Sequence, residues 1–293
     1  GFLRTQDISE EPDRRNRIAE SKSEPEMLKR LALTHEVSRK TAEIEFEKLE
    51  ETDIDFNPED SFAVNAKIIT GELDPQDLED TIGNKISSDR NSVDLENPET
   101  EIMAYVLDET ILLGEKIVGL DRGLFQDRSN EKRPFSSPVS LDPVLARVLV
   151  NLAEIPAGGK LLDPYCGTGG ILIEAGLCRI FPCGTDIKEE MVQGTRKNLE
   201  EYGVINHDIR KADADKSLES FSERFNAIIT DLPYGKASRV KGSPEKEFLD
   251  LIDGFKGKVV FMYNKRTLGS LEADFEIYVH KNLTRYIYVR DNQ

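Results

Sequence analysis

The segment from Lys160 to Gly170, KLLDPYCGTGG, constrains the fold of this chain more than any other. It reads as a short apolar strand that ends in an acid and opens through closely spaced glycines into a helix. In doubly wound sheets, ligands bind at the carboxyl ends of the strands, where glycine allows close backbone approach and a helix N-terminus favours an anion. The turn lacks the third glycine of G-x-G-x-x-G, which disfavours a nicotinamide cofactor. The segment therefore predicts an α/β domain with a different ligand at this turn.

The residues around this turn alternate between helix and strand. Asp142 is placed to cap a helix that begins at Pro143. We then expect a strand over 160–162, a helix over 170–177, a strand over 182–185, a helix over 189–202, and strands over 225–230, 258–263, 275–280 and 285–289. The last two strands are close enough in sequence for an antiparallel hairpin. This βαβ rhythm predicts a mostly parallel sheet with helices on both faces.

The residues before the α/β domain show a different organisation. Helical apolar spacing is present over 25–33 and 41–49, whereas residues 62–69, 102–107 and 111–113 read as strands and residues 75–86 as a helix. Polar residues with glycine and proline follow from Asp121 to Pro138 and indicate a linker. We therefore divide the chain into a helical N-terminal region (1–60), a small α+β domain (61–120), a linker (121–139) and the α/β domain (140–293).

Charge and composition limit the possible function classes. The net charge of -17 opposes indiscriminate nucleic-acid binding, but residues up to Asn130 hold 16 Lys and Arg against 32 Asp and Glu, and the rest hold 23 against 24. Any RNA contact must therefore use local basic patches. No apolar run approaches the length of a membrane span, and no secretory signal is evident. Three cysteines without a CxxC pair and three scattered histidines predict a cytoplasmic protein without a metal site.

Acids stand at the expected ends of four strands: Asp163, Asp186, Asp213 and Asp231. An acid about 20 residues after a glycine turn commonly accepts hydrogen bonds from ribose hydroxyls, which is the role we assign to Asp186. Asp213 would then receive an adenine amino group, and Asp163 would lie near an ammonium group of the cofactor. Any one of these carboxylates could be an ordinary surface acid, but together they indicate a nucleoside-like ligand.

The tetrapeptide Asp231-Leu232-Pro233-Tyr234 indicates the reaction class. An exocyclic amine of a base is a poor nucleophile, so its methylation requires acceptors for the two N–H groups as the nitrogen becomes tetrahedral. Asp231 offers a carboxylate and Leu232 a main-chain carbonyl, while Pro233 fixes φ and has no N–H to donate. Tyr234 offers a face on which a base can stack. Cys166 in the glycine turn is read as a small buried residue rather than as a nucleophile.

At this point the motifs DPYCGTGG, TDI, DA and DLPYG resemble those of class I amino-methyltransferases that act on nucleic acids. Upstream, FAVNAKII, LEDTIGNKI, VDLENPETEI and LLGEKIVG resemble a THUMP domain, an RNA-binding module of RNA-modifying enzymes. With RPFSSPVSLDPVLARVLVNLA and VHKNLTRYIYV, the whole resembles the archaeal tRNA guanosine N2-methyltransferase family that acts at position ten of tRNA. The ferredoxin-like region that usually precedes THUMP is only partly recognisable over 1–60. DLPYG also departs from the more common DPPYG, although its leucine retains the carbonyl.

The resemblance implies a Rossmann-like methyltransferase domain with a mostly parallel seven-stranded sheet, a C-terminal antiparallel hairpin, and a smaller THUMP-type domain before it. It implies S-adenosylmethionine as cofactor, tRNA as partner, and a monomer. The catalytic set would be Asp231, Leu232, Pro233 and Tyr234. The cofactor contacts would be Asp163, Tyr165, Gly167, Thr168, Gly169, Asp186, Ile187, Asp213, Ala214 and Asp231. The RNA contacts would be Tyr234, Gly235, Arg133, Lys236, Arg239 and Lys241.

Two alternative functions stay open at this point. The same chemistry could serve another substrate, such as ribosomal RNA guanine N2, adenine N6 in RNA or DNA, or a protein glutamine. A protein of another class, an RNA-binding module whose methyltransferase fold has lost catalysis, is also compatible with the pattern, since fold alone does not establish activity.

Overall fold

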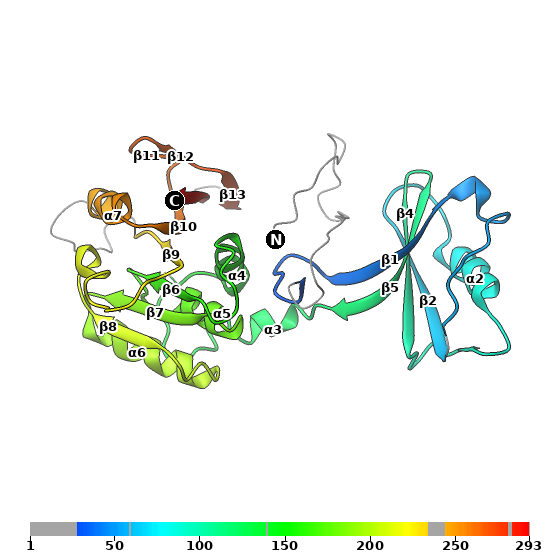
Figure 1. The fold of residues 1–293 in the computed structure, drawn as a ribbon, viewed down its shortest axis with the longest axis horizontal. Coiled ribbons are helices and arrows are strands. Elements are labelled where there is room, and N and C mark those ends of the chain that lie inside the picture. Colours follow the sequence, from blue (N-terminus) through cyan, green and yellow to red (C-terminus); the bar gives the residue numbers. More distant parts are fainter. Residues whose placement is uncertain (1–27, 59, 139, 234–243, 281–282, 293) are drawn as a thin grey trace. The chain divides into compact units, whose positions relative to one another are not determined.

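The structure is a computed structural model that describes residues 28–58, 60–138, 140–233, 244–280 and 283–292. It divides into two compact units, which are described separately (Figure 1). Thr34–Asp121 belong to the first unit, and Arg30–Leu33 together with the residues from Arg122 onward belong to the second. Within the described residues, no helix has both the length and the apolar character needed to cross a bilayer.

The first unit is a five-stranded sheet in the order β1-β5-β4-β2-β3 with one long helix packed on it. β2 runs parallel to β3 and β4, whereas β5 is antiparallel to both β4 and β1. The elements are β1 (Glu36–Glu45), the 3-10 helix η1 (Phe46–Lys48), β2 (Ser61–Ile68), α2 (Pro75–Ile86), β3 (Ser92–Val93), β4 (Thr100–Leu107) and β5 (Thr110–Gly119).

Helix α2 begins and ends where the sequence predicts. The Asp74 side chain accepts a hydrogen bond from the Gln76 N–H at 3.0 Å, and Pro75 takes the first helical position, where its missing N–H costs nothing. Leu78, Ile82 and Ile86 recur every four residues and are buried against the sheet. The helix lies beside β2 in Figure 1.

The helix predicted over 41–49 is wrong. Most of this stretch continues β1, which pairs antiparallel with β5 so that Ile44 lies opposite Ile111. Ile44 is buried while Glu43 and Glu45 are exposed, the period-two alternation of a strand with one buried face. β1 also belongs to the same unit as β2 to β5, so this unit starts earlier than the boundary at residue 61 drawn from the sequence. The helix predicted over 25–33 is also wrong where it can be checked: residues 25–27 lie outside the described residues, only Leu28 is helical, and residues 29–33 form turns and irregular backbone.

The second unit is built on a seven-stranded sheet in the order β13-β14-β10-β9-β6-β7-β8. Only β14 runs antiparallel to its neighbours, β10 and β13, in agreement with the predicted hairpin. The strands are β6 (Lys160–Asp163), β7 (Phe181–Asp186), β8 (Asp208–Lys211), β9 (Ala227–Asp231), β10 (Gly257–Tyr263), β13 (Phe275–His280) and β14 (Leu283–Asn292). The short pair β11 (Thr267–Leu268) and β12 (Leu271–Glu272) lies outside this sheet.

Helices cover this sheet, and two buried clusters mark its two layers. One cluster joins the sheet to α4 (Pro143–Leu152), α5 (Gly170–Leu177) and α6 (Glu189–Glu201) through residues such as Leu149, Leu172 and Leu199. The other joins it to α7 (Pro244–Asp253) through Phe248. Strand β8, the 3-10 helix η2 (Ala214–Lys216) and α7 were not assigned from the sequence.

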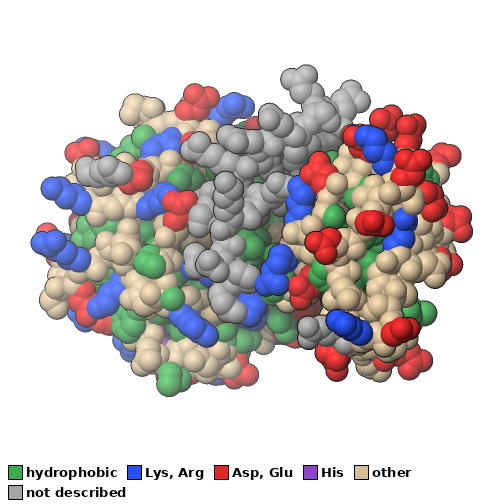
Figure 2. Space-filling model, turned by 45° about the vertical axis from the view of Figure 1, so that its right-hand side comes forward, with side chains coloured by type: hydrophobic (Ala, Val, Ile, Leu, Met, Phe, Trp, Pro, Cys, Tyr) green, Lys and Arg blue, Asp and Glu red, His purple; other side chains and the backbone are tan. Residues whose placement is uncertain are grey.

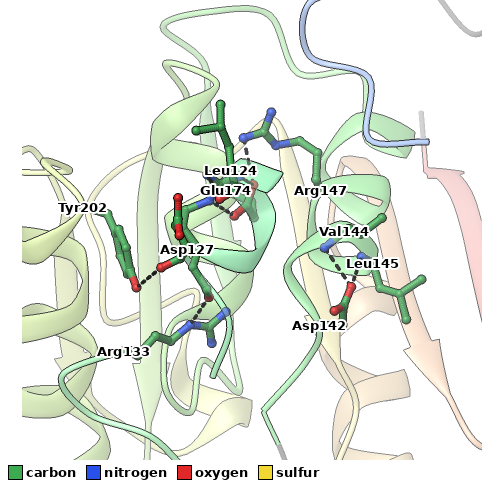
Figure 3. Close-up of polar contacts among 10 residues, drawn as sticks. Leu124, Asp127, Arg133, Asp142, Val144, Leu145, Arg147, Glu174 and Tyr202 are labelled. Atoms are coloured by element: carbon green, nitrogen blue, oxygen red, sulfur yellow. Dashed lines mark hydrogen bonds and ion pairs between the residues drawn. The ribbon is translucent and has the colours of Figure 1, made fainter. Parts of the chain in front are cut away.

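The segment read as a linker is packed into the second unit. It contains the short helix α3 (Gly123–Gln126), and its Arg128 Nε lies 2.7 Å from Glu174 Oε1 on α5. Arg147 of α4 reaches the other oxygen of Glu174 at 2.8 Å, so this fully buried carboxylate meets two guanidinium groups (Figure 3). Glycine and proline correctly indicated irregular backbone here, but irregular backbone can still be an ordered part of a domain.

Candidate active site

The glycine turn joins β6 to α5, and its glycines have separate roles. Gly167 and Gly169 have φ values of 52° and 80°, a left-handed conformation that side chains disfavour. A Cβ on Gly169 would lie 2.8 Å from Thr195 Cγ2, so this glycine lets the turn pack closely on α6. A Cβ on Gly167 would meet only the Tyr165 carbonyl oxygen at 3.9 Å. The backbone at Gly167 can therefore be approached closely by a ligand.

Thr168 and Arg133 lie on the interior side of this turn. The Thr168 hydroxyl hydrogen-bonds with Ser140 Oγ at 2.8 Å, and its carbonyl accepts from Asn198 Nδ2 at 2.9 Å. Arg133 is only 4% exposed, and its Nε donates to the Arg128 carbonyl at 3.0 Å (Figure 3). The RNA-phosphate contact predicted for Arg133 is therefore wrong, because its guanidinium is part of the packing behind the turn.

Asp163 ends β6 and is almost fully buried. Its Oδ1 accepts hydrogen bonds from the Tyr165 N–H at 3.1 Å and from Thr230 Oγ1 at 2.7 Å. Burial raises the pKa of Asp163 to about 7 against the lowering effect of these hydrogen bonds, and the nearby charges of Asp231 and Asp186 raise it further. The carboxylate would thus be stabilised by a cation bound beside it.

Asp186 ends β7 and faces the glycine turn. Its Oδ2 accepts from the Gly167 N–H at 3.2 Å, and its Oδ1 from the Lys188 N–H at 2.8 Å. Burial raises the pKa of Asp186, and the two backbone hydrogen bonds oppose this shift. Ile187, the next residue, is 51% exposed, which is high for a large apolar side chain beside the half-buried Asp186.

The remaining residues predicted around the cofactor differ in how far they are exposed to solvent. Asp213 caps η2 through its backbone with its side chain exposed, and Ala214 is buried. The Tyr165 ring packs on the cluster of Phe248, and burial raises the pKa of its hydroxyl. Cys166 is buried, and desolvation raises the pKa of its thiol well above the ordinary value, so it is unsuited to be a nucleophile.

Asp231 ends β9 and meets an arginine that the sequence reasoning missed. Arg285 Nη2 of β14 contacts Asp231 Oδ1, and their side chains are 8% and 21% exposed. Burial raises the pKa of Asp231 to about 6 even though Arg285 lowers it. The signal that could have indicated Arg285 is a charged residue directly before the apolar and aromatic run YIYV.

The predicted catalytic tetrapeptide is described only in part. Leu232 is buried, and its N–H donates to the Met262 carbonyl at 2.9 Å, which ties the start of the tetrapeptide to β10. Pro233 is half-buried. The predicted residues Tyr234, Gly235, Lys236, Arg239 and Lys241 lie outside the described residues.

Strand register places the acids at one edge of the sheet. β7, β6 and β9 are consecutive and parallel, with Asp163 opposite Gly184 of β7 and Leu162 opposite Ile228 of β9. Asp186, Asp163 and Asp231 are the last residues of these strands, so all three stand at the carboxyl edge that also carries the glycine turn. Among the described side chains, no group of three or more His, Cys, Asp or Glu is arranged to hold a metal ion.

The chain is similar to known proteins over most of its length. Residues 35–114 match the THUMP domain, and residues 130–256 match the RMKL-like methyltransferase domain. A tRNA (guanine(10)-N2)-dimethyltransferase of Methanothermobacter thermautotrophicus is 36% identical over 282 residues, covering 89% of this chain and 83% of the relative. The chain belongs to this family. A second tRNA (guanine(10)-N2)-dimethyltransferase, from Pyrococcus abyssi, is 33% identical, and the match covers 79% of this chain and 74% of the relative.

Membership of the tRNA (guanine(10)-N2)-dimethyltransferase family is consistent with the fold. The crystal structure of TrmN from Thermus thermophilus superposes with a TM-score of 0.50 at 20% identity, covering 94% of this chain and 88% of the other. The predicted Rossmann-like methyltransferase domain after a THUMP-type domain is therefore confirmed.

Proposed function

We propose that this protein transfers methyl groups from S-adenosylmethionine to the exocyclic N2 of the guanosine at position ten of tRNA. Relatives in the same family carry this activity in their names. The observation that carries the proposal is the position of Asp231 at the carboxyl edge of the sheet, one strand away from the glycine turn and close enough to Asp163 to influence its charge. A hydrogen-bond acceptor for an amine thus stands beside a site suited to a nucleoside-like ligand.

The residues of the edge fit S-adenosylmethionine. The open approach to the Gly167 backbone would admit the amino-acid portion, and Asp163 would meet its ammonium group. Asp186 would accept from the ribose hydroxyls, Ile187 would pack on the adenine, and the exposed carboxylate of Asp213 would accept from its amino group. When bound, this cofactor supplies an electrophilic methyl group on a sulfonium.

The chain's own part in the chemistry is to orient the amine. Asp231 and the Leu232 carbonyl would accept its two N–H groups, so that the nitrogen lone pair turns toward the methyl group. Leu232 is held by its bond to Met262, and Pro233 has no N–H to compete for the same space. Tyr234 would stack on the extruded guanine and partly offset an unstacking cost of a few kcal/mol.

The THUMP-type unit would position the tRNA by shape rather than by sequence. Its net charge is strongly negative, and the face seen at the right of Figure 2 carries many Asp and Glu side chains. The overall charge of this unit therefore does not attract the tRNA phosphates, and its contacts with tRNA must be made by local groups of basic residues. Lys236, Arg239 and Lys241, which follow the catalytic tetrapeptide, are proposed to meet phosphates near the target base.

We further propose that the enzyme is a cytoplasmic monomer that needs no metal ion. Light scattering at working concentrations would reveal a dimer, and dialysis against EDTA should leave the rate of transfer unchanged.

The deciding experiment is methyl transfer to defined transcripts. Purified protein, labelled cofactor and unmodified tRNA are incubated, and the digested product is analysed by mass spectrometry. We expect N2-methylguanosine to appear first and N2,N2-dimethylguanosine later, both at position ten, and no label in a transcript with adenosine there. Methylation of another base would contradict the substrate assignment. Cofactor binding without transfer would favour a non-catalytic RNA-binding protein.

A further inference from the structure

We infer that Arg285 is a positioning residue of the methyl-transfer reaction, which holds one oxygen of Asp231 so that the other faces the substrate amine. This inference rests on the proposed function. It concerns a side chain from the last strand of the chain, outside both the glycine turn and the catalytic tetrapeptide.

The topology of the sheet explains how Arg285 reaches this position. β10 and β14 are antiparallel, and their final register pair at this end is Tyr263 with Tyr286. On the other side of β10, Met262 lies opposite Asp231. Because β14 is reversed, its first residues lie at the same edge as the last residues of the parallel strands. Arg285 can therefore reach across the end of β10 to the carboxylate.

The contact takes place in a largely dehydrated environment. The Arg285 side chain is 8% exposed, and its guanidinium contacts Asp231 Oδ1 directly. A planar guanidinium restricts the orientation of the carboxylate it binds more tightly than a flexible ammonium does. With Oδ1 committed to Arg285, Oδ2 is the oxygen with which Asp231 would accept an N–H of the amine.

The same contact governs the charge of Asp231. An ionised carboxylate accepts the N–H of an amine much more strongly than a protonated carboxyl does, and burial opposes ionisation by raising the pKa of Asp231 to about 6. Among the described residues, two charged groups face it: Arg285 from β14, which lowers this pKa, and Asp163 from β6, a like charge. Met262, opposite it on β10, is uncharged. Loss of Arg285 should therefore leave a misoriented and more readily protonated acceptor.

Three variants test this role in the full-length protein: Arg285→Met, Arg285→Lys and, as a matched control, Arg290→Met. Arg290 lies on the same strand and pairs with Asp274 at 2.6 Å, so its removal also costs β14 an ion pair. Far-UV circular dichroism and cofactor affinity establish that each variant is folded. Methyl transfer to tRNA is then measured from pH 5 to pH 9 as kcat and KM.

For Arg285→Met we expect kcat to fall at least about tenfold with KM for tRNA nearly unchanged. The acidic limb of the kcat profile should move to higher pH, because the positive charge that favours the ionised acid is gone. Arg285→Lys should restore the position of the limb and part of kcat, and Arg290→Met should behave as the unmodified protein.

Two outcomes would overturn the inference. If Arg285→Met keeps the kcat and the acidic limb of an active unmodified protein, Arg285 does not position Asp231. If the limb stays in place while kcat falls equally in Arg285→Met and Arg290→Met, the arginine acts only through the stability of β14. Failure of the unmodified protein to methylate guanine N2 would instead reject the proposed function, and this inference with it.

Discussion

The hydroxyl of Thr230 donates to Asp163 across 2.7 Å, and both residues are buried. This bond joins β9 to β6 directly beneath the proposed reaction site, one residue before Asp231. It also provides one of the two hydrogen bonds that keep the pKa of Asp163 from rising further. In our proposal, cofactor binding and amine orientation are thus connected through adjacent strands, and the charge of Asp163 should affect both stability and ligand affinity.

Replacement of Asp163 by asparagine should stabilise the free protein at alkaline pH. The pKa of Asp163 is raised from 3.8 to about 7. The contribution of the protonated group to the free energy of unfolding is therefore fully present below pH 3.8 and is lost as the pH rises through 7. At pH 8, the free energy of unfolding of Asp163→Asn should therefore exceed that of the unmodified protein by on the order of 2 to 4 kcal/mol, as measured by urea unfolding. At pH 5 the difference should be smaller. Cofactor affinity should fall at least about tenfold. A pH-independent difference in stability would show that Asp163 ionises as an ordinary acid.

Addition of a single methyl group at Gly167 should weaken cofactor binding. Gly167→Ala places a Cβ in the open approach to the backbone and imposes strain at a φ of 52°. Gly203→Ala is a matched control, since Gly203 has a φ of 72° and no atom near its own Cβ position. Both should cost about 1 kcal/mol of stability. Calorimetric titration should show a loss of cofactor affinity in Gly167→Ala alone, and equal affinities would contradict the proposed approach.

Removal of the charge of Asp231 should abolish transfer without preventing cofactor binding. Asp231→Asn keeps the size of the side chain but replaces one acceptor by a donor, so kcat should fall at least about 100-fold. Cofactor affinity should remain within about tenfold, or 1.4 kcal/mol. Asp274→Asn, which loses a similar ion pair with Arg290, should retain its rate. Near-normal turnover by Asp231→Asn would refute the assignment of this carboxylate.

Glu174→Gln should be the most destabilising conservative substitution considered. It leaves the largely buried Arg128 and the buried Arg147 without their shared counter-charge, which typically costs about 3 to 5 kcal/mol. The exposed pair of Lys40 with Glu43 offers a comparison, and Glu43→Gln should change stability by less than about 1 kcal/mol. Urea unfolding measures both. Similar losses in the two variants would argue against a structural role for the buried cluster.

Local signals were sufficient for much of the fold. The cap at Asp142 with proline after it marked the start of α4, and the glycine turn marked both the end of β6 and the start of α5. These features depend on neighbours within a few residues, so sequence spacing contains the necessary information.

Features that depend on distant partners were harder to predict. β1 appears as a helix when Ile44 and Leu49 are considered alone, because its pairing with β5 is not visible in its own residues. In the sequence, Arg133 reads as an exposed basic residue beside a serine-rich loop. In the fold, its guanidinium packs against Thr168 and Gly170. Arg285 reaches Asp231 only because β14 is reversed and inserted beside β10.

The late position of β14 has a consequence for biosynthesis. Arg285 follows Asp231 by 54 positions, whereas Asp163, Gly167 and Asp186 all precede Asp231. A nascent chain that has left the ribosome only as far as β10 already contains the glycine turn and the three acids around it, but lacks the counter-ion of Asp231. In our proposal, such a chain contains the residues of its methyl-donor site before Arg285 is available to hold Asp231, and transfer becomes possible only after β14 has been made.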